Sequence, residues 1–183
     1  MAIDAEKALP YGLRDVKITP ISAAGVYGTM IDLPVSRTMT WTDTVDTQEL
    51  RGDDKVVATR ESSGSVDWDL EAGGIPLTAY AAIAGGVVAL TGVTPAAKRT
   101  YSKVGSDNRP YFYCEGQAIN DNGGDTHVVL YRCKATGDIG GEFSDGAFAL
   151  TNCSGSAVPD SFHSDKVYDI VHNETTLATV VPT

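Results

Sequence analysis

Long hydrophobic runs are missing from this chain of 183 residues. No apolar stretch approaches the roughly 18 residues that cross a bilayer, so we expect no membrane-spanning helix. The first residues carry no basic patch followed by an apolar stretch, so we expect no signal peptide either. The length and the hydrophobic fraction of 42% instead predict a single folded domain over residues 1–183.

Cysteine is scarce as well. Cys114, Cys133 and Cys153 are an odd number of thiols without CxxC spacing, which argues against a zinc site. Cys114 and Cys133 lie in apolar, strand-like segments. This favours buried free thiols and a reducing compartment where the chain folds.

Positive charge is in short supply. Lys and Arg number 14 against 24 Asp and Glu, which gives a formal net charge of −10. A tight grip on nucleic acid is therefore not expected, because it needs cations that displace phosphate counterions. A surface past which nucleic acid moves remains compatible with this charge, since like charge lowers affinity.

Motifs that carry catalysis or bind cofactors are also missing. His127, His163 and His172 lie in no HxH or HExxH arrangement. No GxSxG frames a serine nucleophile and no GxxxxGK[ST] cradles a phosphate. Residues 120–125 are rich in oxygen ligands but lack the EF-hand pattern, and they are more typical of a turn. We therefore expect no enzyme, no cofactor and no metal.

What the sequence does contain is β-strand patterning, clearest over residues 66–71. Apolar and acidic side chains alternate there and fall on opposite faces of an extended chain. The two sets are Val66, Trp68 and Leu70 against Asp67, Asp69 and Glu71. Carboxylates about 7 Å apart along a strand would suit a two-carboxylate glycosidase. A solvated or lumen-lining face is the preferred interpretation, because any half-exposed strand shows this alternation.

Other strands follow from alternation and turn residues. Residues 38–42 place Met39 and Trp41 inward, and residues 55–71 predict a hairpin around a Ser-Gly turn. A second hairpin joins 111–114 to 128–131 around Asn122-Gly123. If that pair centres the turn, Cys114 faces Tyr131 and Cys133 faces Phe112. Further strands are expected at 14–20, 26–32, 143–151 and 166–173.

One helix interrupts the strands. Pro76 near its start and Gly85 past its end mark a helix over residues 75–84. Ile75, Ala79, Tyr80 and Ile83 form its apolar stripe, which should lie against the sheets. The expected fold class is thus mainly β: an antiparallel β-sandwich or barrel flanked by one α-helix.

Residues 43–54 follow neither period. They hold five acids and one Arg, and they predict a long exposed loop between early strands, mobile in the free protein and ordered on a partner. Arg and a buried aliphatic side chain are common anchors at such contacts. The candidate contact residues are Asp43, Asp46, Glu49, Leu50, Arg51, Asp53 and Asp54.

Particular strings along the chain carry a resemblance. They are residues 13–20 (LRDVKITP), 49–58 (ELRGDDKVVA), 66–75 (VDWDLEAGGI), 109–112 (RPYF), 115–118 (EGQA), 124–135 (GDTHVVLYRCKA) and 141–146 (GEFSDG). In this order and spacing, from about residue 9 to residue 174, the sequence resembles the major tail (tail tube) proteins of long-tailed, non-contractile bacteriophages (siphophages). None of the strings is a catalytic signature, so the resemblance lies in their order.

The resemblance implies a tail-tube fold, six copies of which close into a ring and pool strands into one inner β-barrel. Rings stack into a hollow tube around the tape-measure protein, between tail-tip and tail terminator proteins. Genomic DNA passes through the lumen without specific binding. The chain would then belong to the virion tail, assembled in the host cytoplasm without binding membrane. Residues 43–54 would reach the neighbouring ring.

Two expectations about surfaces follow. Asp67, Asp69 and Glu71 are the candidates for lining the lumen, and residues 177–183 are a candidate C-terminal arm that orders on a partner. The alternative is a β-sandwich carbohydrate-binding module. It would need an exposed aromatic platform, whereas Trp41 and Trp68 are both expected to face inward.

Overall fold

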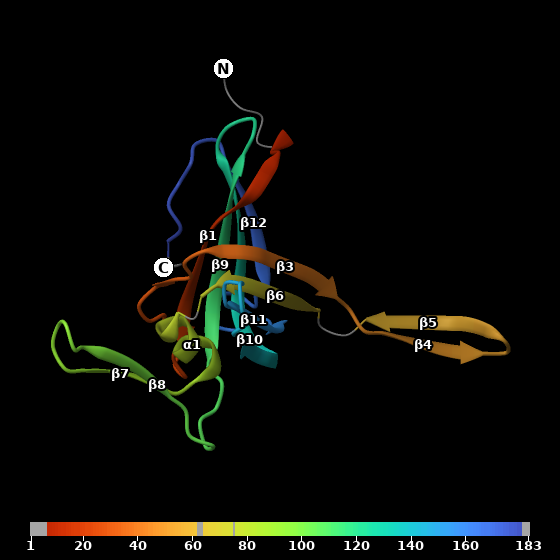
Figure 1. Cartoon of the computed structure of the whole chain (residues 1–183). Helices are drawn as coiled ribbons and strands as arrows, with labels where there is room; N and C mark the ends of the chain where they lie inside the picture. Colours follow the sequence, from red (N-terminus) through yellow and green to blue (C-terminus); the bar gives the residue numbers. More distant parts are fainter. Residues whose placement is uncertain (1–6, 62–63, 75, 181–183) are drawn as a thin grey trace.

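The structure is a computed structural model that describes residues 7–61, 64–74 and 76–180. It is mainly β, with antiparallel strand pairs and one helix (Figure 1). The elements are β1 (Pro10–Ile21), β2 (Ile31–Asp32), β3 (Ser36–Thr44), β4 (Thr47–Gly52), β5 (Lys55–Glu61), β6 (Ser65–Gly73), α1 (Leu77–Ala84), β7 (Val87–Thr91), β8 (Lys98–Ser102), β9 (Tyr111–Asn120), β10 (Asp125–Gly141), β11 (Leu150–Ala157) and β12 (Tyr168–Asn173). The expected fold class, a β-sandwich flanked by one helix, is confirmed.

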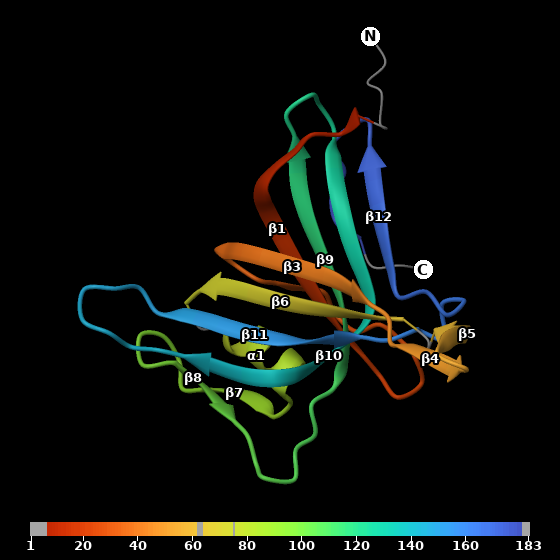
Figure 2. The ribbon, with the colours of Figure 1, turned by 90° about the vertical axis from the view of Figure 1, so that its right-hand side faces the viewer.

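The long strand β10 joins two layers. Its first half pairs with β9 and β12, and its second half pairs with β11. The strands run in the order β2-β1-β9-β10-β11-β6-β3. We call β2, β1, β9, β12 and the first half of β10 the first layer, and the second half of β10 with β11, β6 and β3 the second layer. Figure 2 shows the strands of the two layers crossing.

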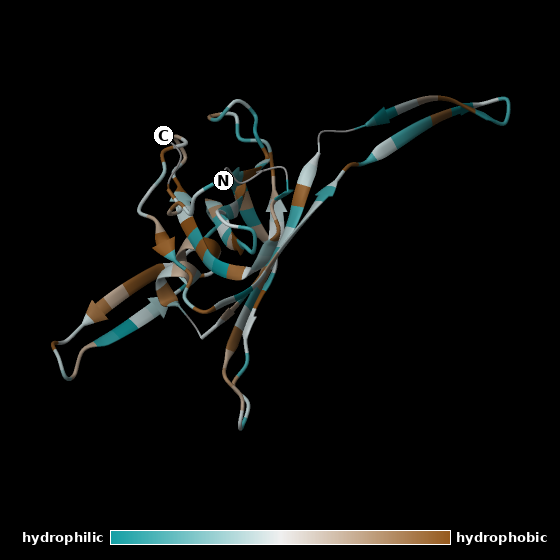
Figure 3. Ribbon diagram, turned by 90° about the horizontal axis from the view of Figure 1, so that it is seen from above, coloured by the Kyte–Doolittle hydropathy of each residue, from teal (hydrophilic) through white to brown (hydrophobic). Residues whose placement is uncertain are grey.

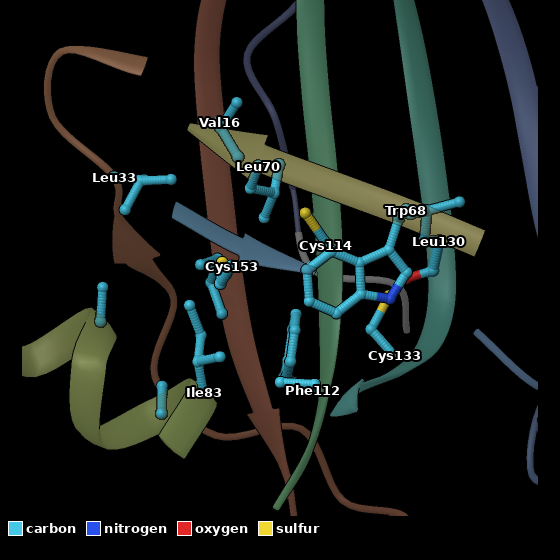
Figure 4. Close-up of a cluster of buried hydrophobic side chains, with 14 of the residues drawn as sticks. Val16, Leu33, Trp68, Leu70, Ile83, Phe112, Cys114, Leu130, Cys133 and Cys153 are labelled. Carbon is cyan, nitrogen blue, oxygen red and sulfur yellow. The ribbon is translucent and has the colours of Figure 1, made fainter. Parts of the chain in front are cut away.

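The hydrophobic core fills the space between the layers. Trp68 of β6 packs edge-on against Phe112 of β9, with ring centroids 5.5 Å apart and an interplanar angle of 75°. Val66 and Leu70 are buried beside Trp68, as the alternation predicts. Ile83 of α1 closes one end of this core (Figure 4).

Helix α1 spans Leu77–Ala84, close to the predicted range. Gly85 ends it with φ 79°, a conformation that suits glycine. Tyr80 is half-buried rather than fully buried, and its ring meets the edge of Tyr101 at 5.4 Å. Ile75, the expected first helical residue, lies outside the described residues.

The hairpin of β9 and β10 is confirmed, but its register is shifted by one residue from the predicted one. Cys114 faces Leu130, not Tyr131, whereas Cys133 does face Phe112. The shift begins at the turn, where Asp125 already faces Ile119, and the irregularity between Leu130 and Cys133 restores the predicted pairing beyond it. All three cysteines are buried and free, as expected.

The hairpin predicted over residues 55–71 is wrong. β5 pairs with β4, while β6 pairs with β3 and β11. The segment from β3 to β6 is one long hairpin whose outer part, β4 and β5, continues beyond the body (Figure 1). The Ser-rich segment that predicted a turn lies between β5 and β6 in the sequence. Residues 62–63 of it lie outside the described part.

Of the other predicted strands, two are confirmed, one is much shorter and one lies later in the chain. Strands at 14–20 and 166–173 are found as β1 and β12. The strand expected at 26–32 shrinks to β2 and an isolated bridge at Tyr27. The strand expected at 143–151 lies later, as β11.

Trp41 is partly exposed, so the expectation that it is buried is wrong. It lies opposite Trp68 in the β3–β6 register and shares its face, yet 39% of it is exposed. The reason is its place on the edge strand, where the first layer covers only part of it. Met39, two residues earlier, is half-buried against the core.

Candidate functional site

The outward face of the second layer carries the three acidic side chains of β6. Val66, Trp68 and Leu70 point into the core, so strand alternation sends Asp67, Asp69 and Glu71 to the other side. Asp67 and Asp69 are exposed, and Glu71 is half-buried with Arg37 at 3.5 Å. The three acidic side chains therefore share one outward face, as the alternation predicts.

Neighbouring strands extend this face with uncharged polar groups. The residues aligned with Asp67, Asp69 and Glu71 are Thr42, Thr40 and Thr38 on β3 and Ser156, Ser154 and Asn152 on β11. Each carboxylate thus lies between a threonine and a serine or asparagine. We call these nine residues the acidic face. The carboxylates repel phosphate, and the hydroxyl and amide groups bind water without adding positive charge, so this surface suits contact with a passing polyanion better than capture of one.

The second layer has two open edges. β3 is the last strand in the sheet order, and beyond Cys133 the second half of β10 pairs on one side only, with β11, among the described residues. Unpaired strand edges present free N–H and C=O groups that template pairing with another chain. A layer with an edge at each side can add copies head to tail.

The predicted loop 43–54 is a β-hairpin, which corrects the expectation. Asp43 belongs to β3, Asp46 lies between strands, and Glu49, Leu50 and Arg51 belong to β4. Asp53 and Asp54 form the two-residue tip, with φ 49° and 60°. Two consecutive positive φ angles are those of a type I′ turn, which Asp tolerates. The missed signal is Asp-Asp between two segments that pair.

We call residues 45–61 the acidic arm. It projects from the body (Figure 1). Every described residue of β4 and β5 is exposed, including Leu50 at 64% and Val57 at 65%. Arg51 pairs with Glu49 at 2.9 Å within the arm. An isolated two-stranded hairpin is marginally stable in water, so such an arm is suited to a contact outside its own chain.

A second projecting hairpin was not anticipated as strands. β7 and β8 pair over residues 87–102, around the segment 91–97 that the sequence does mark as a loop. We call residues 87–102 the basic arm, because it contains Lys98 and Arg99 and no acid. The available signal was an apolar run, Val87 to Leu90, followed after Pro95 by a polar strand-like run.

A buried polar network lies on the outer side of the first layer. His127 Nδ1 is 2.6 Å from Glu115 Oε1 and His127 Nε2 is 2.9 Å from Asp125 Oδ2. Gln117 Nε2 and the Leu177 backbone N–H also donate to Asp125 Oδ2, at 2.6 and 3.0 Å. Sequence reasoning missed this network, although polar residues alternate along both strands.

The ionisation of this network is set by its contacts. Burial disfavours the charge of His127, but its hydrogen bonds with Asp125 and Glu115 outweigh that effect and raise its pKa. Burial likewise opposes the charge of Asp125, yet the hydrogen bonds from His127, Asn173 and others keep its pKa low. With both ring nitrogens facing carboxylates, a charged His127 donates to each. The cluster is a closed structural anchor.

The anchor holds the beginning of the predicted C-terminal arm. The Leu177 N–H donates to Asp125, and its carbonyl accepts from Gln117 Nε2 at 2.8 Å. Residues 181–183 of that arm lie outside the described residues. Across the described ranges, His, Cys, Asp and Glu side chains form no group arranged to bind a metal ion.

Comparisons with known proteins add no assignment. No family model matches the chain, and no curated protein matches it significantly. No helix within the described residues is long and apolar enough to cross a membrane.

Proposed function

We propose that this chain is the structural subunit of a siphophage tail tube. The observation that carries the proposal is the second layer, which has an apolar inner face, a hydrophilic acidic outer face and an open edge on each side. Head-to-tail pairing of such edges around an axis closes a barrel and removes the edges altogether. Six copies would form each ring, as the sequence resemblance implies.

The acidic face then lines the lumen. The apolar inner face of the layer cannot do so, because it packs against the first layer in the hydrophobic core. The net charge of −10 and the carboxylates of this face disfavour adhesion of DNA phosphates. Genomic DNA therefore slides past without specific binding, after the tape-measure protein has left.

Rings stack into the tube through projecting parts of the subunit, among which the acidic arm is the longest candidate. A ring closes by rotation, whereas stacking stays open and builds a filament. The filament ends at the tail-tip and tail terminator proteins, within the virion tail.

Electron microscopy tests this function directly. The purified chain, concentrated at near-neutral pH, should form hollow rings or tubes in negative stain, and class averages should show six-fold symmetry. Sedimentation velocity on the same sample should give species much larger than the 19.3 kDa monomer. A strict monomer at every concentration, with no rings, would contradict the proposal.

A carbohydrate-binding module is the second candidate, and Trp41 favours it. Its indole is 39% exposed beside Leu13 and Met39, at a cavity of about 80 Å³. Aromatic faces of this kind can stack on sugar rings. The cavity is smaller than the roughly 300–1,000 Å³ of usual ligand sites, which weakens this candidate. Glycan-array binding that Trp41→Ala abolishes, by a monomeric protein, would favour it over the tube.

A further inference from the structure

The two projecting arms carry opposite charge. The acidic arm holds five acids against three bases, a net charge of −2, and the basic arm holds Lys98 and Arg99 without an acid, a net charge of +2. Neither Lys98 nor Arg99 forms an ion pair within the described ranges. Opposite charges on exposed surfaces steer association and fix which surfaces meet.

The arms project from opposite sides of the body. Figure 1 shows β4 and β5 extending to one side and β7 and β8 to the other, and the view from above in Figure 3 agrees. One molecule cannot bring its own arms together. Complementary surfaces at opposite ends of a subunit make a heterologous contact, which continues from copy to copy.

Exposed apolar side chains accompany the charges on both arms. Leu50 and Val57 of the acidic arm are matched by Val87 and Leu90 of the basic arm, which are 68% and 64% exposed. β7 appears in Figure 3 as a hydrophobic strand beside the hydrophilic start of β8. Apolar centres with charged surroundings are typical of surfaces that dock.

We propose that the acidic arm of one copy docks against the basic arm of another copy. This deepens the proposed function, on which it rests, because it names the surface that receives the acidic arm. Leu50 covers Leu90 of β7, which is the register partner of Arg99, while Asp46 and Glu49 lie near Lys98 and Arg99. Each copy gives one arm and receives another, so the contact repeats along the assembly.

Charge reversal tests the docking. Asp46→Lys with Glu49→Lys changes the acidic arm from −2 to +2, and Lys98→Glu with Arg99→Glu changes the basic arm from +2 to −2. Each double variant should need at least about tenfold more protein to assemble in 50 mM salt, because like charges then face each other. A 1:1 mixture of the two should assemble near the wild-type concentration, since each supplies what the other lacks. The quadruple variant should also recover.

Two controls separate the outcomes. Asp121→Lys with Glu174→Lys changes the charge by +4, as the acidic-arm double variant does, at exposed positions outside the arms, and should assemble like wild type. Circular dichroism and melting temperature show whether each variant folds. Double variants that assemble like wild type, or a folded mixture that fails to recover, would overturn the docking while leaving the tube intact. A wild type without rings or tubes contradicts the proposed function instead, and sedimentation in low salt then still reports whether the arms associate.

Discussion

Trp68→Ala should destabilise the fold strongly. A buried aromatic side chain covers about 150–250 Å² of surface. At about 25 cal/mol per Å², its removal from the core costs about 4–6 kcal/mol before relaxation. The surroundings resist collapse, because Phe112 and the backbone at Gly155 line the ring closely. We expect a net loss of about 3–5 kcal/mol, within the usual range for deleted buried aromatics.

Two matched variants sharpen this prediction. Trp68→Phe keeps a ring and removes the Nε1–H, which has no hydrogen-bond partner in the described structure, so it should cost much less than Trp68→Ala. Trp41→Ala removes the same side chain from the same face of the second layer. Since Trp41 is partly exposed, that change should also cost less.

Urea unfolding at constant pH, followed by tryptophan fluorescence and circular dichroism, measures the three free energies. Thermal melting should show Trp68→Ala at least about 6 °C below the parent, since about 1 kcal/mol corresponds to about 2–4 °C in a domain of this size. A Trp68→Ala protein that melts like the parent would show that the assigned facing of the second layer is reversed. A larger loss for Trp41→Ala would show instead that the first layer covers Trp41 better than Trp68.

Four further predictions concern the anchor, the thiols, the acidic face and the acidic arm. The raised pKa of His127 means that its stabilisation is complete below the unfolded value of about 6.5 and is lost as pH rises through the folded pKa. The lowered pKa of Asp125 means that its stabilisation is present above its unfolded pKa of about 3.8 and is lost as pH falls through the folded pKa. The midpoint of urea unfolding should therefore be higher at pH 5.5 than at pH 8. His127→Gln should reduce this difference between the two midpoints. Alkylation of the unfolded, unreduced protein should modify all three cysteines, which mass spectrometry can count. An intact disulfide in this sample would refute the prediction of three free thiols. Lysine at all three β6 carboxylates should leave rings intact but hinder genome ejection; normal ejection from normal tails would place the acidic face elsewhere. Because Thr44 and Ser65 are register partners, replacing residues 45–64 with Asn-Gly should spare the fold and prevent stacking, and tubes of normal length would exclude the arm as the stacking element.

The sequence by itself determined the local structure where one periodic signal acts without competition. Alternation over residues 66–71 predicts both the strand and its facing, because a half-buried strand must separate apolar from polar side chains. Pro76 and Gly85 bound helix α1 for equally local reasons. The Asn-Gly signal predicts the β9–β10 hairpin, although the two positive φ angles of the turn belong to Gly123 and Gly124.

Tertiary structure decided which strands pair. β5 follows a strand-like pattern and comes directly before β6 in the sequence, yet it pairs with β4, because β3 and β11 take the two sides of β6. Pairing between strands far apart in sequence depends on which faces bury together, and no local window contains that information. The same limit applies to Trp41, whose exposure depends on how far the first layer reaches over β3.

The candidate surfaces divide in the same way. The acidic residues of β6 and of residues 43–54 are identified from the sequence alone, because the charge of a side chain follows from its residue type. Their setting was not: the acidic face needed the register with β3 and β11, and the anchor needed Glu115, His127 and Asp125 to meet across two strands. The opposite placement of the arms depends on where β3, β6 and α1 leave the core. The sequence determines which chemical groups each segment carries, whereas contacts between distant segments determine which of these groups share a surface.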